Sequence, residues 1–321
     1  MSGGFVLGCD GGNTKTIALV AQPDGRIVGW GRAGSSDVHD TAGPTAALDE
    51  LRRAVEDACA MAGCDGGAID RAVFGLAGAD WPEDFALLGD AMRTVIGGEA
   101  TILNDAVNAI RCGTSDGVGV VVSCGTGGTA AGMGPDGTIY HRGFWPEPSG
   151  AREIGRLGLS AVQRAHLGLG LPTALTERAL ERYGAADPDE LLHVLTRRDR
   201  GGQTDQRWFC PDVLDVAADG DPVAIAIVRR EGKVLGDQAA VCARELALAD
   251  GFPLVFVGGV FRHPSSLLRD TVLAQVPHGA PVEAKVEPAV AALLRAFDAI
   301  GVTADEAVQA SLPAADVFAT S

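Results

Sequence analysis

The chain has 321 residues, of which 46% are hydrophobic and 21% charged, so it is long enough for two domains and too apolar for disorder. Its formal net charge of −16 argues against nucleic acid or an anionic membrane as the main partner. The cysteines number seven and form no CxxC pair, which argues against a disulfide framework or a zinc site and indicates buried thiols in a reducing compartment.

The N-terminal segment Met1-Ser2-Gly3-Gly4 lacks the basic region of a signal peptide. No apolar run reaches the roughly 18 residues of a membrane span. We therefore expect a cytoplasmic protein without a membrane partner.

The first third of the chain predicts an α/β unit. Its expected strands are residues 5–10, 17–22, 26–32, 72–76 and 101–103, and its expected helices are residues 43–62 and 83–96. A meander of three strands followed by helix–strand–helix–strand is typical of a mixed sheet flanked by helices.

The meander then recurs. Strands are expected at residues 118–122, 130–133 and 138–142, again joined by a glycine turn and an Asp-Gly turn. Such a recurrence can arise by chance, but it favours two α/β domains of one topology, residues 1–113 and 114–321, each presenting a glycine turn to a shared cleft. Whether the last helix, near 288–300, packs back on the first domain stays open.

The second half is mostly helical. Helices are expected near residues 152–168, 173–182, 188–198 and 221–249, from Pro264 and from Pro288, strands at 254–257 and 281–285, and a polar loop at 199–212. The tail after Gly301 is loosely patterned.

The segment from Asp10 to Thr16 (Asp-Gly-Gly-Asn-Thr-Lys-Thr) follows an apolar run. Glycines let the backbone approach a phosphate, and the acid can hold a Mg²⁺ that shares the phosphate charge. An ordinary β-turn is the alternative, because Gly-Gly and Gly-Asn pairs are common at hairpin tips.

Standard nucleotide-binding motifs are missing, since the sequence holds neither GxxxxGK[ST] nor a GxGxxG between strand and helix. Three glycine turns remain, at Gly11-Gly12, Gly125-Thr126-Gly127-Gly128 and Gly258-Gly259. The first two can clasp phosphates, and the third can let a base or ribose lie against bare backbone.

Asp105 follows the strand that ends at Leu103-Asn104, where open α/β sheets bind ligands. It can accept a proton from a hydroxyl that attacks the γ-phosphate. Asp or Asn before a helix is also a normal N-cap, and both roles can hold together.

The order and spacing of these motifs, with Gly75-Leu76-Ala77-Gly78-Ala79-Asp80 between them, resemble the BadF/BadG/BcrA/BcrD ATPase family in its N-acetylglucosamine kinase-like branch. The resemblance spans roughly residues 5 to 300. It implies two duplicated actin-like ATPase domains of the ribonuclease H-like type, with ATP in the interdomain cleft.

By this likeness Asp105 is the general base and Asp10 orients a hydrated Mg²⁺. Gly258 and Gly259 match the adenosine loop, and Thr14 and Thr126 contact phosphates. The full set of expected phosphate-binding residues is Gly11, Gly12, Asn13, Thr14, Lys15, Gly125, Thr126 and Gly127.

The chain departs from the family where the family reads its sugar. Asp37 stands where the branch usually has Asn, Gly128-Thr129 where it has Asn or Ser-Asn, and Arg156 replaces an acid. Arg152 and Arg156 lie four apart, so they either hold an anionic group of the substrate or form a solvated charged face with Glu153. The candidate acceptor-binding residues are Asp37, Gly78, Asp80, Asn104, Thr129, Arg152 and Arg156.

The leading hypothesis is therefore a Mg²⁺-ATP phosphotransferase that acts on a hydroxyl of a sugar, amino sugar or sugar-like small molecule. The alternatives are an ATPase that activates a partner enzyme and an ATP-binding regulatory protein without an acceptor. The likeness also favours a homodimer.

Overall fold

The computed structural model describes residues 4–40, 42–141, 147–197 and 205–319. It divides into two compact units, residues 1–119 with 282–321, and residues 120–281. Residues 282–321 therefore belong to the first unit, whereas the sequence pattern predicts a single division of the chain near residue 113. The end of the strand predicted at 138–142, residue 198 and residues 199–204 of the predicted polar loop lie outside the described residues.

The first unit is built on a mixed sheet with the strand order β3-β2-β1-β4-β5. Its strands are β1 (Phe5–Gly11), β2 (Thr16–Ala21), β3 (Ile27–Ala33), β4 (Ile69–Leu76) and β5 (Glu99–Asn104). β1 is antiparallel to β2 and parallel to β4, and β4 is parallel to β5. The carboxyl ends of β1, β4 and β5 therefore share one edge, which is the edge where the candidate acids lie.

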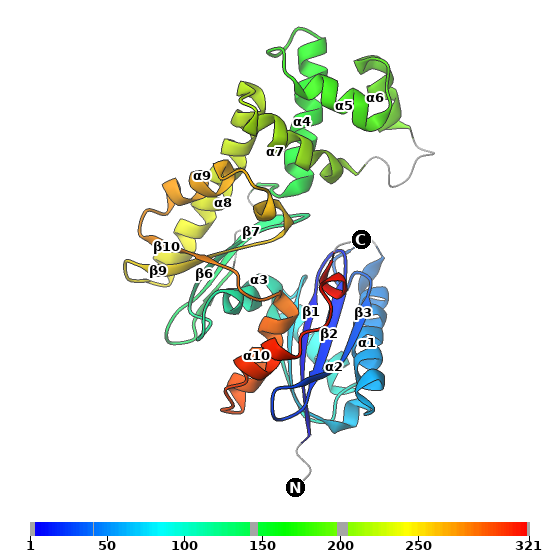
Figure 1. Ribbon diagram of the computed structural model, residues 1–321, viewed down its shortest axis with the longest axis vertical. Helices are drawn as coiled ribbons and strands as arrows, with labels where there is room; N and C mark the ends of the chain where they lie inside the picture. The colour runs from blue at the N-terminus through cyan, green and yellow to red at the C-terminus, as the bar shows by residue number, and fades with distance from the viewer. Residues whose placement is uncertain (1–3, 41, 142–146, 198–204, 320–321) are drawn as a thin grey trace. The chain divides into compact units, whose positions relative to one another are not determined.

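Helices cover both faces of this sheet (Figure 1). They are α1 (Gly43–Ala62), α2 (Pro82–Arg93), the short α3 (Asp105–Ala109), α10 (Pro288–Ala299) and α11 (Asp305–Ala310). Because side chains alternate along a strand, Leu7 of β1 packs in the core with α1, and Val6 packs in the core with α10. A Cβ at Gly8 would meet the Leu293 backbone nitrogen at 2.1 Å, so α10 lies directly on β1.

The second unit repeats the strand order, as β10-β9-β6-β7-β8. Its strands are β6 (Gly119–Cys124), β7 (Gly128–Met133), β8 (Ile139–Tyr140), β9 (Phe252–Val257) and β10 (Gly279–Glu283). β6 is parallel to β9, as β1 is to β4, and β7 is antiparallel to β8. The prediction of two α/β halves with one topology is confirmed.

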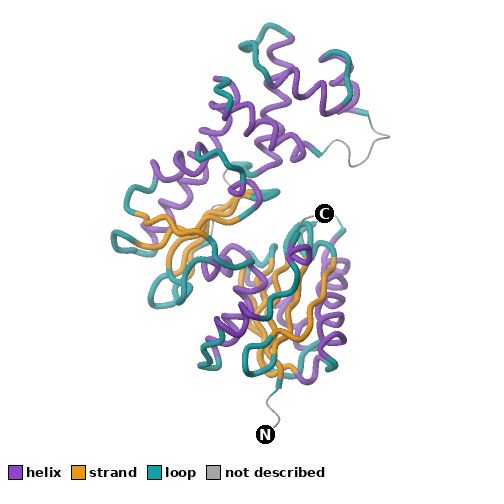
Figure 2. The backbone as a smooth tube through the Cα atoms, in the orientation of Figure 1, coloured by secondary structure: helices purple, strands orange, loops and turns teal. Residues whose placement is uncertain are grey.

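The remainder of the second unit is largely helical (Figure 2). Its helices are α4 (Ala151–His166), α5 (Leu175–Tyr183), α6 (Pro188–Thr196), α7 (Cys210–Ala218), α8 (Pro222–Glu245), α9 (Leu267–Gln275) and the short 3-10 helix η3 (Gln206–Phe209). The prediction of a polar loop is wrong for residues 206–212, because η3 and the start of α7 occupy them and bury Phe209 and Cys210 in the core. α8 begins as predicted, with the Asp221 carboxylate accepting hydrogen bonds from the backbone of Val223 and Ala224.

The cysteines fit the interpretation of small buried groups. All seven lie in the described residues and are free, and six of them are buried. No helix in the described segments is long and apolar enough to span a bilayer.

Candidate functional site

The turn between β1 and β2 carries the first predicted phosphate site. The Gly12 amide donates to the Lys15 carbonyl over 2.9 Å and closes the turn. A Cβ at Gly11 would meet the Ser36 hydroxyl at 2.1 Å, so a larger residue beside Asp10 would displace the Ser36 side chain of the segment after β3. At Gly12 the nearest atom to an added Cβ is 3.7 Å away, which leaves room beside the backbone.

Asp105 lies at the carboxyl edge of the same sheet, as the first residue of α3. Asn104, the last residue of β5, is the N-cap, because its Oδ1 accepts a hydrogen bond from the Ala106 amide over 2.9 Å. The Asp105 carboxylate accepts from the same amide over 2.8 Å. The predicted cap is therefore present, and it leaves the second oxygen of Asp105 for other chemistry.

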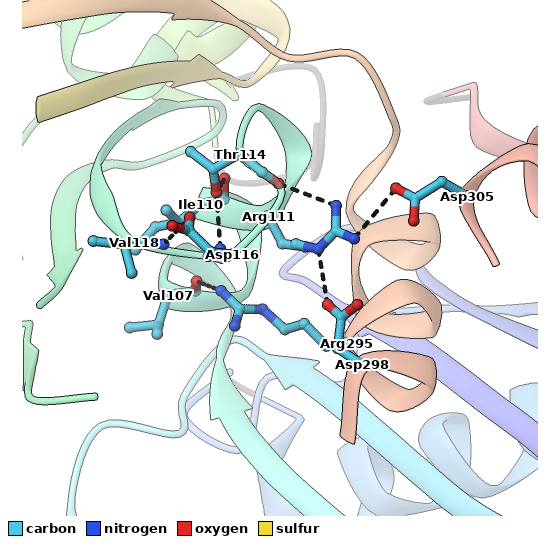
Figure 3. A network of polar contacts seen from close by, with 10 residues as sticks. Val107, Ile110, Arg111, Thr114, Asp116, Val118, Arg295, Asp298 and Asp305 are labelled. Atoms are coloured by element: carbon cyan, nitrogen blue, oxygen red, sulfur yellow. Dashed lines mark hydrogen bonds and ion pairs between the residues drawn. The ribbon is translucent and has the colours of Figure 1, made fainter. Parts of the chain in front are cut away.

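A polar network ties the segment after Asp105 to the C-terminal helices of the unit (Figure 3). Buried Arg111 donates through Nε to Asp298 over 3.0 Å and through Nη2 to Asp305 over 3.3 Å. Arg295 of α10 donates to the Val107 carbonyl of α3 over 3.1 Å. These contacts fix α3, and with it Asp105, against α10.

The candidate acceptor residues of the first unit come together around the same edge. Asn104 Nδ2 donates to Asp80 over 3.1 Å. Asn13 of the phosphate turn donates its side-chain amide to Asp37. Gly78 has a φ of +76°, and a Cβ there would meet an Asp37 oxygen at 2.5 Å, so only glycine lets the carboxylate lie so close.

The clustering of acids perturbs their protonation. Burial, the charge of Asp105 and that of Glu287 raise the pKa of Asp10 to about 8. Burial and the charges of Asp80 and Asp37 raise the pKa of Asp105 to about 6. Like charges near one another favour a cation, and a carboxyl that titrates near neutral pH is suited to accept a proton.

Sequence reasoning missed two supporting side chains. Buried Asp84 accepts from the Trp81 amide over 2.9 Å and lies 3.2 Å from His39 Nε2. Although burial lowers the pKa of His39, the hydrogen bond and charge of Asp84 raise it. Pro82 at the start of α2 with an acid two residues later is the signal that marks Asp84 as a helix-start residue.

The second unit carries the other predicted phosphate turn, between β6 and β7. The Gly125 amide donates to the Gly127 carbonyl over 2.9 Å. The first turn of α4 is attached to it, because the amides of Ala151 and Arg152 donate to the carbonyls of Gly125 and Thr126 over 2.8 and 3.2 Å. An added Cβ at Gly125 or Gly127 would meet nothing within 4 Å.

A buried acid, Glu231, binds the backbone of Gly150, which packs against this turn. Glu231 of α8 is fully buried and accepts from the Gly150 amide over 2.6 Å. Gly150 has a φ of +94°, and a Cβ there would meet the Gly127 backbone at 2.3 Å, so no larger residue fits. Burial raises the pKa of Glu231 to about 7.

The other candidate acceptor residues have partners in their own unit. Exposed Arg156 donates through Nε to Glu153 over 2.7 Å, and Arg152 Nε lies 4.0 Å from Asp205. These pairs are what the charged-face interpretation expects, and a role in holding an anion stays a prediction. Thr129 lies on β7, where its hydroxyl is 3.5 Å from the Ala130 carbonyl.

The third glycine turn follows β9. Gly258 has a φ of +101°, and a Cβ there would meet the Cys124 carbonyl at 2.3 Å, so this turn presses against the end of β6. Gly259 has open space where a Cβ would be. This space is compatible with the adenosine assignment of Gly258 and Gly259, which stays a prediction.

Magnesium suits the donors of the first unit. In the described part of the chain no group of three or more His, Cys, Asp or Glu side chains is arranged to hold a metal ion. Mg²⁺ usually keeps several waters and binds through one or two carboxylates and substrate phosphates, so it needs no such cage. Asp10 can serve as such a carboxylate, because there is space beside the Gly12 backbone and the negative charge of Asp105 favours a cation near Asp10.

The comparisons with known proteins decide the family. The sequence profile of the BadF/BadG/BcrA/BcrD ATPase family matches residues 7–296. The chain belongs to this family. It is 25% identical to an N-acetyl-D-glucosamine kinase of Dictyostelium discoideum in an alignment of 318 residues that covers 93% of this chain and 99% of the relative.

Solved structures of this family's fold resemble the chain over most of its length. One, from Chromobacterium violaceum, is named as a candidate N-acetylglucosamine kinase and has a TM-score of 0.70, 24% identity and coverage of 92% and 99%. A ROK family glucokinase from Streptomyces griseus, in complex with glucose and AMPPNP, has a TM-score of 0.57, 18% identity and coverage of 91% and 98%. The predicted actin-like fold with two α/β domains is confirmed.

Proposed function

We propose that this BadF/BadG/BcrA/BcrD family member transfers the γ-phosphate of ATP to a hydroxyl of a sugar, amino sugar or sugar-like small molecule. The observation that carries the proposal is Asp105. Asp105 follows β5 at the carboxyl edge of the sheet, its neighbour Asn104 is bonded to Asp80, and the pKa of its carboxyl is raised to about 6. It is thus mostly ionised at neutral pH and still basic enough to receive a proton.

The reaction follows from that placement. Asp80 and Asn104 hold the acceptor by hydrogen bonds to its hydroxyls. One hydroxyl oxygen forms a bond to the γ-phosphorus while the bond from that phosphorus to the β,γ-bridging oxygen breaks. The proton of the attacking hydroxyl moves to Asp105, and ADP leaves with the bridging oxygen.

The nucleotide is proposed to bind through the glycine turns. Residues 11–15 and 125–127 would donate backbone amides and hydroxyls to its phosphates, and Gly258-Gly259 would meet the adenosine. Mg²⁺, when bound, would supply positive charge to the phosphate oxygens, and Asp10 would hold it through water. That a single nucleotide contacts both phosphate turns stays a prediction.

The acceptor class is supported by the relative from Dictyostelium, which is named an N-acetyl-D-glucosamine kinase. The resemblance leads us to expect departures from that branch at Asp37, at Gly128-Thr129 and at Arg156. N-acetylglucosamine is therefore the first acceptor to test, in a panel with hexoses, other hexosamines and cyclitols.

The test compares acceptor-dependent ADP release in the wild type and in Asp105→Asn, with Asp49→Asn as a control on the exposed side of α1. Asp105→Asn is expected to lower kcat about 10²- to 10⁴-fold and to keep its affinity for ATP. The control is expected to match the wild type. Full activity of Asp105→Asn would overturn the assignment of the base.

The two alternatives give different results in the same experiment. An ATPase activator hydrolyses ATP without any acceptor of the panel and needs its partner enzyme for the physiological effect. A regulatory protein binds ATP and turns over none of the panel. The expected replacement of the family's acid by Arg156 motivates this hypothesis.

A further inference from the structure

We propose that Arg207 is a phosphate-binding residue, which together with Thr126 holds the terminal phosphates of the nucleotide. The proposal rests on the proposed function, because it takes the turn at residues 125–127 as a phosphate site. It adds a cationic side chain to a turn that otherwise offers backbone amides and one hydroxyl.

The geometry points Arg207 at the turn. Its Nη1 donates to the Thr126 hydroxyl oxygen over 3.4 Å. The backbone beside Thr126 is open, since added Cβ atoms at Gly125 and Gly127 would meet nothing within 4 Å. An anion that accepts a hydrogen bond from Thr126 therefore lies within reach of the guanidinium group.

The guanidinium group is also held in place before any ligand arrives. Asp205 lies 2.9 Å from Arg207 Nε, and the guanidinium carbon lies 4.8 Å from the centre of the Trp208 ring. The side chain is only 26% exposed. A planar donor that is already ordered loses little conformational entropy when it binds a phosphate.

Helix α4 contacts both the turn at residues 125–127 and η3. A Cβ at Gly155 would meet the Gln206 carbonyl at 1.8 Å, so η3 lies directly on the helix backbone. The amide of Ala151, one helical turn earlier, donates to the Gly125 carbonyl over 2.8 Å. Arg207 and Thr126 are thus positioned by the same helix.

Charge favours an anion here. Among the described residues, Arg152 and Arg207 both pair with the carboxylate of Asp205, at 4.0 and 2.9 Å. These three described side chains, two arginines and one aspartate, carry a net positive charge in a chain whose formal net charge is −16. Guanidinium groups suit phosphate oxygens because they are planar and carry several N–H donors.

A purely structural role for Arg207 is the competing explanation, because the contact with Thr126 also joins η3 to the turn. The two roles differ in which ligand is affected. A phosphate-binding arginine changes affinity for phosphorylated ligands and leaves adenosine alone, whereas a structural arginine changes the melting temperature and all ligands together.

The experiment titrates Mg²⁺-ATP, tripolyphosphate and adenosine into the wild type, Arg207→Gln and Arg207→Lys by calorimetry. Arg229→Gln, which removes an exposed arginine of α8, is the charge-matched control. Arg207→Gln is expected to weaken ATP and tripolyphosphate about 10- to 100-fold, with adenosine and the melting temperature unchanged. Arg207→Lys is expected to lose less, and Arg229→Gln nothing.

Two results would overturn the proposal: equal ATP affinity in Arg207→Gln and wild type, or a parallel loss of adenosine binding and thermal stability. A wild type that binds neither ATP nor tripolyphosphate would also overturn it. If ATP binding depends on Arg207 but no acceptor of the panel is phosphorylated, the proposal stands and the kinase assignment fails.

Discussion

Glu231→Gln should stabilise the second unit at neutral and higher pH, because it removes a charge that the folded protein buries. The Glu231 side chain is fully buried, and one of its oxygens has no hydrogen-bond partner in the described structure. The other accepts from the Gly150 amide over 2.6 Å, a bond that the glutamine carbonyl can keep.

The magnitude follows from the protonation of Glu231. Burial raises its pKa from 4.5 to about 7, so the folded state binds the proton more tightly than the unfolded state does. Stability is therefore greatest below the unfolded pKa and falls as the pH rises toward the folded pKa. The loss amounts to about 3 kcal/mol at about pH 8 and about 1 kcal/mol at about pH 5. Glutamine does not ionise, so the variant avoids this loss of stability at each pH.

Urea unfolding at the two pH values, read by hydrogen exchange in α8, measures the free energy of unfolding of the second unit. Glu153→Gln is the matched control, because Glu153 is also buried but is paired with Arg156 and Arg230. That variant should lose stability. A Glu231→Gln variant no more stable than the wild type at about pH 8, or shifted equally at both pH values, would refute the reasoning.

Three further predictions concern the glycine turns at residues 11–12 and 125–128, the protonation of Asp105 and the bonds of Arg111. Gly12→Ala and Gly127→Ala should each leave the melting temperature unchanged, because an added Cβ meets no atom closer than 3.7 Å. Each variant should weaken ATP binding about tenfold or more. An effect at only one turn would mean that ATP uses one turn alone. The kcat/KM for the acceptor should fall as the pH drops through about 6, because Asp105, whose pKa is raised by burial and by the charges of Asp80 and Asp37, is then protonated. A kcat/KM that stays flat from about pH 5 to 8 argues for another base. Arg111→Met should lower the stability of the first unit by about 1–3 kcal/mol in thermal unfolding, since it removes the bonds to Asp298 and Asp305, and an unchanged melting temperature would show that the network does not hold α3.

The elements that the sequence predicted well are those with local signals. The run that ends at Leu103-Asn104 is apolar and then polar, so both the strand end and the N-cap of Asp105 are readable from a few neighbouring residues. The repeated meander is likewise defined by nearby turns, and the structure has the same strand order in both units.

The parts that were missed depend on contacts between distant residues. Arg207 reaches Thr126 across 81 residues of sequence, and Glu231 reaches Gly150 across the same separation. The polar residues of the predicted loop at 199–212 do not indicate that η3 packs against α4 at Gly155. The apolar face of the last helix predicts burial, yet only the fold shows that it covers β1.

The most direct test of phosphoryl transfer uses ATP whose γ-phosphate carries oxygen-18, incubated with Mg²⁺, the acceptor panel and either wild type or Asp105→Asn. The proposed mechanism predicts an acceptor whose own hydroxyl oxygen is retained and which gains the labelled phosphoryl group, in the wild type and not in the variant. Labelled inorganic phosphate, with no labelled acceptor in any sample, would contradict it.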